Sequence, residues 1–231
     1  MGKGGAAAAK LLLALLVLAG CSHTTGGQSR PTGAPTPAPP GAPPATPPPG
    51  AAAAPTPPGP GTPVADVSAW IQAGEPTDAG RFHVATREGV TTQLGDDVAF
   101  VTPSGKTTCM TDSKHAGGAL ACLVKLDNPP PRPADAQTEW IGGWVDFDGS
   151  SITVGGLHGD PGRFTAGDGP QLPYGSSLKF GDYQCRSDAA GLYCVDYAHQ
   201  SAARFSAAGI VAFGCARQAT PPPDIGEKFV C

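Results

Sequence analysis

The sequence has no apolar stretch long enough to span a membrane. The longest such run, Leu11 to Ala19, covers nine residues, whereas a transmembrane helix needs about 20. Positive charge is also scarce, because Lys and Arg number 15 against 19 Asp and Glu and are scattered singly. This balance gives a formal net charge of −4, which argues against binding to nucleic acid and against electrostatic attraction to anionic lipid.

The short motifs of common catalytic sites are missing as well. The sequence contains no Gly-x-Ser-x-Gly elbow, no phosphate-binding loop, no His-Glu-x-x-His and no Cys-x-x-Cys pair. These are the usual signals of serine hydrolases, nucleotide binding, zinc proteases and redox or zinc cysteines. We therefore predict no catalytic residue, no metal site and no cofactor.

Two groups of residues still suggest part of a Ser-His-Asp site, since each has a His near an Asp. They are His158-Gly159-Asp160 and residues 196–201, which include His199. The remaining histidines of this region, His83 and His115, could pair with a carboxylate and a serine in the same way. Polar loops and hydrogen-bonded turn ends are the simpler explanation, because a β domain of this size offers such combinations by chance.

The segment Asp146-Phe147-Asp148-Gly149-Ser150 resembles part of a calcium-binding loop. It lacks the third Asp or Asn ligand before the glycine and the Glu that closes such a site. The dipeptide Asp148-Gly149 is also a typical tight turn between two strands. A β-hairpin explains these residues without an ion.

The first 20 residues have the layout of a secretory signal. Lys3 and Lys10 precede the apolar run, and Leu18-Ala19-Gly20 leads into Cys21. This arrangement resembles the bacterial lipobox. The resemblance implies that the Cys21 thiol is alkylated with diacylglycerol, that residues 1–20 are removed and that the new amine is acylated. An ordinary signal peptide that carries a cysteine would also export the chain.

Removal of residues 1–20 would have two physical consequences. Loss of two lysines takes the formal charge from −4 to −6. Two or three acyl chains on Cys21 would hold the protein stably on a bilayer, whereas a single chain would not.

Residues 21–63 are expected to form a disordered tether. The part from residue 30 to residue 63 consists almost only of Pro, Ala, Gly and Thr and holds fifteen of the 27 prolines. Such a segment buries too little apolar surface to offset its ordering entropy. Extended as polyproline II, it would reach roughly 100 Å. A PxxP ligand for a partner is the less favoured alternative.

Residues 64–231 are expected to form a single disulfide-rich domain of mainly β structure, as a sandwich or barrel. Thr62, Pro63 and Gly74 suit the cap, start and stop of one short helix whose apolar face includes Trp70. Short β-prone runs bounded by turn residues follow. They cover residues 82–86, 98–102, 106–111, 120–126, 140–147, 151–154, 177–180, 183–186, 192–197 and 210–213.

Six cysteines remain after Cys21, an even number that is typical of disulfides in an exported chain. They are Cys109, Cys122, Cys185, Cys194, Cys215 and Cys231. Four of them lie in a repeat, since Gly-x-x-x-Cys-x-x-Asp followed by Leu-x-Cys occurs at residues 105–122 and 181–194. The simplest pairing joins the two cysteines of each hairpin and leaves the last two for each other. Six cysteines allow 15 pairings, however, and links between hairpins stay open.

The hairpins carry a resemblance to a known group. A Pro-Ser-Gly turn at residues 103–105 precedes the first cysteine of the set, and Leu-Pro-Tyr-Gly at residues 172–175 precedes the second hairpin. With the lipobox and the tether, the chain resembles actinobacterial cell-envelope lipoproteins and is most similar to the LppI group of mycobacterial type. The resemblance supports the location and the β-hairpins, and it implies no activity or functional residue.

Four aromatic residues could line a ligand groove for a glycan or a lipid: Trp140, Trp144, Phe147 and Tyr174. Trp140 and Trp144 lie four residues apart in a predicted strand and should point to the same face. Gly142-Gly143 between them would leave an open surface or a bulge. Packing in the core is the more ordinary role for all four.

Three functions are compatible with these features. The first is a non-catalytic binding or structural role in the cell envelope. In this case the exported chain is anchored to the outer face of the bacterial cytoplasmic membrane through lipid on Cys21, with an envelope component as partner. The second is a carrier of a lipid or other small apolar ligand between the sheet and the helix. A secreted hydrolase is the third and least favoured.

Overall fold

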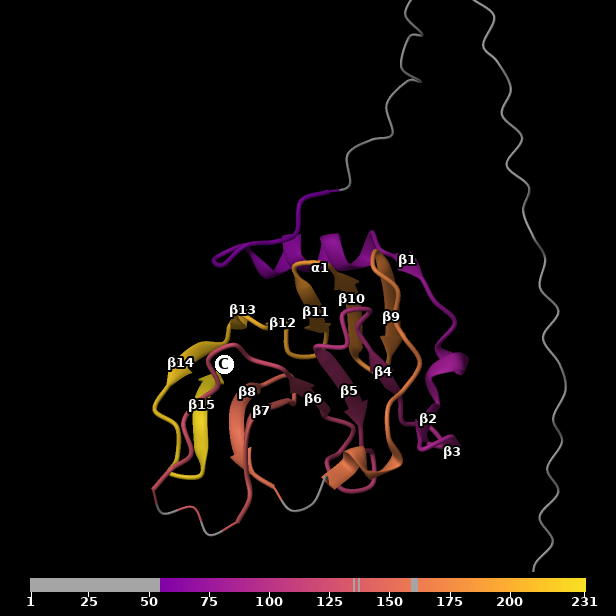
Figure 1. Cartoon of the computed structure of the whole chain (residues 1–231). Helices are drawn as coiled ribbons and strands as arrows, with labels where there is room; N and C mark the ends of the chain where they lie inside the picture. Colours follow the sequence, from indigo (N-terminus) through magenta and orange to yellow (C-terminus); the bar gives the residue numbers. More distant parts are fainter. Residues whose placement is uncertain (1–54, 135, 137, 159–161) are drawn as a thin grey trace, which may run out of the picture. The chain divides into compact units, whose positions relative to one another are not determined.

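In the computed structural model, the described residues are 55–231 except 135, 137 and 159–161. The predicted signal, Cys21 and the tether up to residue 54 therefore lie outside the described residues. The predicted fold class is confirmed, since the domain is mainly β with one short helix ahead of the strands and three disulfides (Figure 1).

The strands form two large sheets and a separate hairpin. The six-stranded sheet has the order β1 (Glu75–Pro76), β9 (Ser176–Phe180), β10 (Tyr183–Asp188), β11 (Gly191–Asp196), β12 (Ser201–Ser206) and β13 (Gly209–Gly214). The seven-stranded sheet has the order β14 (Arg217–Ala219), β15 (Ile225–Val230), β8 (Ser151–Leu157), β7 (Trp140–Phe147), β6 (Leu120–Val124), β5 (Thr107–Thr111) and β4 (Ala99–Val101). The hairpin consists of β2 (Val84–Arg87) and β3 (Val90–Gln93).

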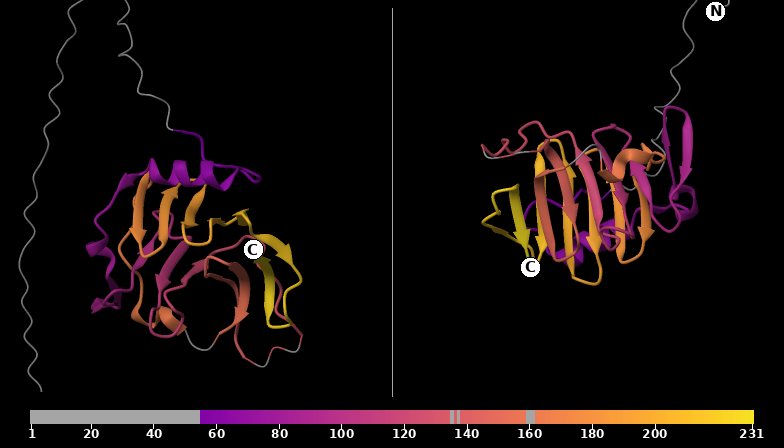
Figure 2. Two further views of the ribbon diagram at one scale, coloured as in Figure 1. Left: turned by 180° about the vertical axis from the view of Figure 1, so that it is seen from behind. Right: turned by 90° about the horizontal axis from the view of Figure 1, so that it is seen from below.

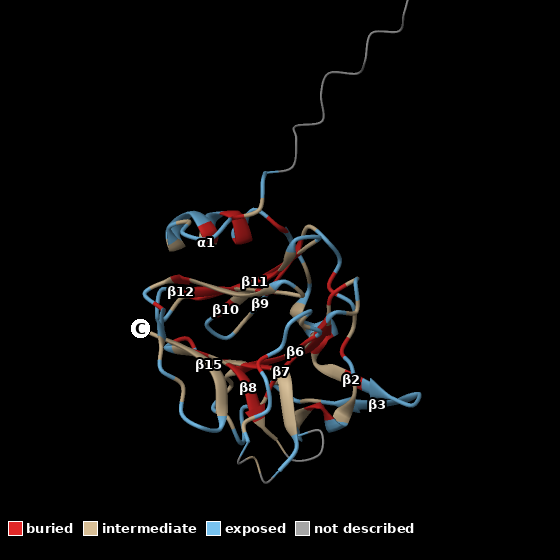
Figure 3. Ribbon diagram, turned by 60° about the vertical axis from the view of Figure 1, so that its left-hand side comes forward, coloured by how far each residue is buried: buried red, intermediate tan, exposed pale blue. Residues whose placement is uncertain are grey.

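The two large sheets face each other as the layers of a sandwich (Figure 2). Helix α1 (Val64–Gln72) covers the outer face of the six-stranded sheet, as Figure 3 shows. The 3₁₀ helix η2 (Gly162–Ala166) and β2 contribute to a separate apolar cluster with the outer face of the seven-stranded sheet. Apolar residues therefore occupy three layers: under α1, between the sheets, and beneath η2.

Each sheet is built around the same five-stranded unit. Strands β4 to β8 succeed one another across the seven-stranded sheet, and β9 to β13 do so across the six-stranded sheet. Within both units every strand is antiparallel to its neighbours. We refer to residues 99–157 and 176–214 as the first and second repeat. The similarity around the cysteines thus extends over two complete five-stranded units.

The two repeats agree in register at their core positions. In each repeat a Cys–Cys cross-strand pair is accompanied by a Leu–Phe pair and a Phe–Ile pair. The pairs are Cys109–Cys122, Leu120–Phe147 and Phe147–Ile152 in the first repeat, and Cys185–Cys194, Leu192–Phe205 and Phe205–Ile210 in the second. All of these residues belong to the cluster between the sheets or pack against it. Equivalent side chains therefore meet across the sandwich.

The disulfides follow the simplest of the pairings that the sequence allowed. They are Cys109–Cys122, Cys185–Cys194 and Cys215–Cys231. The first two join directly opposed residues of β5–β6 and β10–β11 and are fully buried. Disulfides form and persist in oxidising compartments, so three of them indicate an extracytoplasmic protein.

Helix α1 forms where the sequence predicts it and buries Val67, Trp70 and Ile71. Its ends differ in detail from the prediction. Pro63 occupies the N-cap position, and its ring has no oxygen to cap the helix; the Thr62 hydroxyl donates to the Gly59 carbonyl oxygen at 2.8 Å. At the other end, the Gly74 amide donates to the carbonyl oxygen of Ile71 at 3.1 Å.

Arg186 of β10 stabilises the last turn of α1. Its guanidinium lies 3.9 Å from the centroid of the Trp70 ring, and Nη1 donates to the Trp70 carbonyl oxygen at 2.5 Å. Carbonyl groups at a helix C-terminus carry partial negative charge, and α1 has no basic residue in its last turn. The sheet therefore supplies the positive charge that the helix lacks, and Trp70 also packs on Tyr193 at 4.8 Å.

Residues 55–63, which their composition assigns to the tether, pack on this layer instead. The carbonyl oxygen of Pro55 accepts a hydrogen bond from Trp70 Nε1 at 3.0 Å, and that of Pro58 accepts one from the Tyr193 hydroxyl at 3.1 Å. Pro58 is buried. Proline carbonyls remain good acceptors, so two buried aromatic donors draw the chain onto the domain ahead of residue 64.

Ten of the strands were predicted, β7 with the observed bounds and nine with shifted ends, and five were not: β1, β3, β12, β14 and β15. Strand β12 begins Ser-Ala-Ala, and β15 has Glu227 and Lys228 at its centre. Small or charged residues give little β signal on their own. Both strands form because neighbouring strands offer them hydrogen-bonded edges.

Candidate functional site

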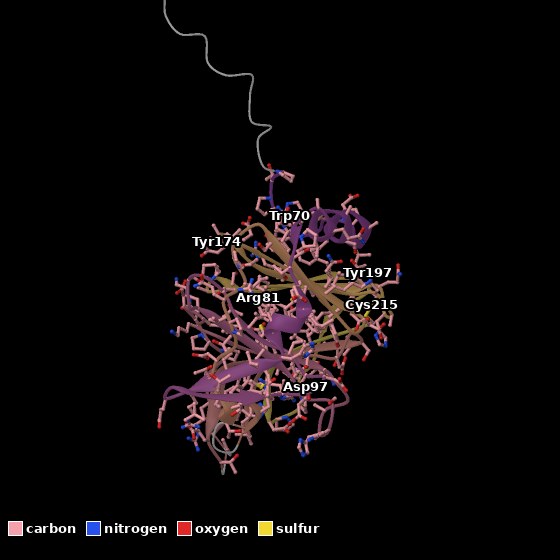
Figure 4. The ribbon with its side chains drawn as sticks, turned by 90° about the vertical axis from the view of Figure 1, so that its right-hand side faces the viewer. Trp70, Arg81, Asp97, Tyr174, Tyr197 and Cys215 are labelled. Carbon is pink, nitrogen blue, oxygen red and sulfur yellow. A yellow bond between two sulfur atoms is a disulfide. The ribbon has the colours of Figure 1, made fainter. Side chains whose placement is uncertain are left out.

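A groove of about 500 Å³ lies on the outer face of the first repeat. Its walls come from β5 with the turn that follows it, from η2, and from the segment after the β2–β3 hairpin. Polar groups in its lining are Asp97, Asp112, His115, His158 and Arg163, and apolar ones include Leu94, Met110 and Trp144. Asp97 marks this groove in Figure 4, on the part of the domain away from Trp70 and α1.

Trp144 forms the floor of the groove. Its ring stacks on His158 with centroids 3.6 Å apart and meets the edge of Phe164 from η2 at 5.1 Å. The indole Nε1 donates to Asp146 Oδ2 at 2.9 Å. Because Trp144 is only 3 % exposed, a ligand would contact mainly the imidazole of His158 and only the uncovered edge of the indole.

Arg163 is the cation of the groove wall, and its side chain is 15 % exposed. Nη1 donates to the Ala119 carbonyl oxygen at 3.2 Å, and Nη2 lies 3.5 Å from Asp146 Oδ1. A guanidinium has five N–H donors. Arg163 is therefore held in place while donors remain for a ligand.

The acidic side chains of the groove already accept several hydrogen bonds. Asp97 accepts from the Thr111 hydroxyl at 2.8 Å and from the backbone and hydroxyl of Ser113. Asp112 accepts from the backbone and Nδ1 of His115 at 3.0 Å. Burial raises the pKa of Asp112, but the hydrogen bonds from His115 outweigh it and leave this pKa below its ordinary value.

The pKa of His158 lies below that of a free imidazole, so its neutral form is favoured. Partial burial lowers the pKa of His158, and the positive charge of Arg163 lowers it further, while the negative charge of Asp146 raises it in part. A neutral imidazole offers one donor and one acceptor. Together with the apolar floor, the groove can bind a ligand that has both apolar and hydrogen-bonding groups.

The predicted group at residues 196–201 is only partly assembled as a catalytic site. Asp196 accepts hydrogen bonds from the His199 backbone at 2.8 Å and from His199 Nδ1 at 3.0 Å. The Ser201 hydroxyl, however, donates to the carbonyl oxygen of Gly149. Since its proton is directed at a backbone carbonyl, Ser201 is not activated by His199 in this arrangement.

These residues instead fasten the β7–β8 turn to the second repeat. Gly149 lies so close to Asp196 and His199 that a Cβ at this position would collide with both side chains. The neighbouring Tyr183 hydroxyl donates to the Phe147 carbonyl oxygen at 3.0 Å, and burial, with the nearby charge of Asp196, raises the pKa of Tyr183. The arrangement is a buried polar anchor between the two sheets.

The other predicted site residues are scattered. Of the His158-Gly159-Asp160 group, residues 159 and 160 lie outside the described residues. His83 Nδ1 lies 2.8 Å from the backbone oxygen of Asp97. In the segment that resembles a calcium loop, Asp148 accepts hydrogen bonds from the backbone and hydroxyl groups of Ser150 and Ser151, as expected for a hairpin turn.

The four aromatic residues do not form one surface. Phe147 is buried between the sheets, and Tyr174 is 48 % exposed on a turn. Trp140 Nε1 donates to the Pro130 carbonyl oxygen at 3.0 Å, away from the Trp144–His158 stack. The register of β7 against β8 shifts between Ile141 and Val145, as expected for a bulge at Gly142-Gly143.

No family of known proteins, no curated protein and no solved structure shows significant similarity to the chain. The resemblance to envelope lipoproteins therefore stays a prediction. Among the described residues, no helix has the length and apolar character needed to cross a membrane, and no cluster of three or more His, Cys, Asp or Glu could hold a metal ion.

The environment of His158 gives a testable titration. We expect an NMR titration to give a His158 pKa below 6.5, its ordinary value. Asp146→Asn should lower this pKa further and Arg163→Gln should raise it. The folded state then binds this proton less readily than the unfolded state. His158 therefore stabilises the fold above about pH 6.5, and this stability is lost as the pH falls from 6.5 through the lower pKa of the folded state. A His158 pKa above 6.5 would contradict the assignment.

The anchor role of Gly149 can be tested by substitution. Gly149 has φ of 87°, so Gly149→Ala should cost about 1–2 kcal/mol for the left-handed backbone and about 1–3 kcal/mol more for crowding Asp196 and His199. The control is Gly175→Ala, with φ of 81° and open space around its Cβ, which should show the backbone cost alone. Equal losses in urea unfolding would exclude the proposed contact.

Proposed function

We propose that the chain is an exported lipoprotein, anchored to the outer face of the bacterial cytoplasmic membrane through Cys21, whose domain binds an envelope component without catalysis. The observation that carries the binding role is the groove on the first repeat. It combines an apolar floor with the donors of Arg163 and His158, and its described lining contains no serine or cysteine. The three disulfides are consistent with the location.

The packing under α1 bears on the carrier alternative. A carrier was expected to use a cavity between the helix and its sheet. Val67 and Ile71 are fully buried there, and Trp70 fills the space over Tyr193. Side chains therefore occupy this interface, and the binding role rests on the opposite side of the sandwich.

Binding can be tested by cosedimentation with purified bacterial cell-wall sacculi. We expect the secreted Cys21→Ser chain to pellet with the sacculi without degrading them. Arg163→Gln should weaken the apparent affinity about tenfold, the loss expected from one charged hydrogen-bond donor. Arg81→Gln is the matched control, because Arg81 is exposed and lies outside the groove. No binding, an equal loss in both variants, or release of soluble wall fragments would reject the proposal.

The anchor has a separate test. In the native host, the wild-type chain should fractionate with membranes, and its N-terminal peptide should start at Cys21 with the added mass of acyl chains. Cys21→Ser should appear in the soluble exported fraction, because the acyl chains supply the membrane affinity. An unmodified Cys21 thiol in membrane-bound wild-type protein would contradict lipid anchoring.

A further inference from the structure

The third disulfide lies outside the pattern that the other two share. Cys109–Cys122 and Cys185–Cys194 occupy matched places in the two repeats and are fully buried. Cys215 and Cys231 are both exposed, and Figure 4 shows Cys215 at the margin of the domain. A dissolved thiol can therefore reach this bridge and not the other two.

The exposed bridge closes a segment that is additional to the repeats. Cys215 follows β13, Cys231 directly follows β15, and β14 and β15 lie between the two cysteines. Strand β15 is added to β8 at the edge of the first repeat, and the described residues contain no equivalent strand beyond β13 in the second. We call residues 215–231 the C-terminal strap.

The strap is only moderately attached apart from its disulfide. Every residue of β15 is half-buried, and β14 is mostly exposed. Phe229 packs against the cluster between the sheets, and the Cys231 amide donates to the Ser150 carbonyl oxygen at 2.9 Å. Edge pairing, the contact of Phe229, the buried Ala216 at the start of the strap and the bridge therefore hold the strap in place.

The surroundings of Cys215 favour opening of the bridge at this sulfur. Nη1 of Arg217 donates to the carbonyl oxygens of Gly214 and Ala216, at 2.7 and 3.0 Å, which places a positive charge around Cys215. Positive charge stabilises a thiolate and makes it a better leaving group. Once reduced and protonated, the Cys215 thiol would also find an acceptor, since the His199 carbonyl oxygen lies 3.6 Å from Sγ.

We propose that Cys215–Cys231 is a thiol–disulfide exchange site that releases the C-terminal strap, with an extracytoplasmic dithiol protein as reductant. A thiolate of the reductant attacks Sγ of Cys231, forms a mixed disulfide and expels the Cys215 thiolate, which takes up a proton. The second thiol of the reductant then attacks the mixed disulfide and frees Cys231 as a thiol. The chain gains two electrons and two protons, and the reductant is oxidised to a disulfide.

Release of the strap would change one edge of the sandwich. Without the bridge, residues 215–231 no longer form a closed loop, and a segment without this cross-link opens locally more readily. Opening of β15 would leave the backbone N–H and C=O groups along one side of β8 unpaired, and such an edge can accept another strand. The two buried disulfides would keep both repeats intact.

The exchange can be tested on the full chain with dithiothreitol under native conditions. Samples are alkylated at intervals, and the labelled peptides are quantified by mass spectrometry. We expect Cys215 and Cys231 to be labelled at least tenfold faster than the other four cysteines of the domain. Hydrogen exchange in residues 225–230 should rise at least tenfold after this step, while exchange in β10 and β11 stays unchanged.

Two sets of variants complete the test. The double variant Cys215→Ser and Cys231→Ser should show fast exchange in residues 225–230 without dithiothreitol. Arg217→Gln should slow reduction several-fold, whereas Arg132→Gln should not, although Arg132 also donates to two backbone carbonyls. Simultaneous labelling of all six cysteines, or unchanged protection of β15 after reduction, would overturn the proposal. An equal effect of both arginine variants would overturn the role of Arg217.

Discussion

The packing of two equivalent half-cores against each other is the constraint on which the whole domain depends. Each repeat places a buried disulfide, a leucine and a phenylalanine on the inner face of its sheet, and neither sheet could bury that face alone. A disulfide within each hairpin fixes the register of two strands, and a slip by one residue would turn the apolar face outwards. Each such bridge adds about 2–4 kcal/mol by restricting the unfolded chain.

With the inner faces equivalent, the difference between the repeats lies on their outer faces. Arg186 and Tyr193 of the second repeat receive α1 through Trp70. The first repeat receives the shorter η2, with Phe164 against Trp144. The nine-residue amphipathic helix α1 covers its sheet, whereas the five-residue η2 leaves part of the surface uncovered. The groove therefore exists because η2 covers less of the first repeat than α1 covers of the second.

The sequence was informative where one local signal determines the structure. The cysteine hairpins, the helix around Trp70 and the Asp148-Gly149 turn could all be predicted, because spacing or turn chemistry defines them within a few residues. The full repeat was hidden, since outside the cysteine hairpins the match rests on a few core residues, and the connections between strands differ in length. The groove could not be predicted either, because Asp97, His115 and Arg163 come from three separate segments that only the fold brings together.

The tertiary fold also explains why residues that are close in sequence suggested a catalytic group that does not assemble. Asp196, His199 and Ser201 suggested a catalytic group, yet the carbonyl oxygen of Gly149 in the other repeat accepts the hydrogen bond of the Ser201 hydroxyl, and Gly149 packs against Asp196 and His199. In a duplicated sandwich, the turns of one sheet end beside the strands of the other, and buried polar groups there must find partners across the interface. Polar residues near the sheet ends thus join the two halves. The ligand recognition that we propose is left to polar residues of the outer face, where no second repeat competes for their hydrogen bonds.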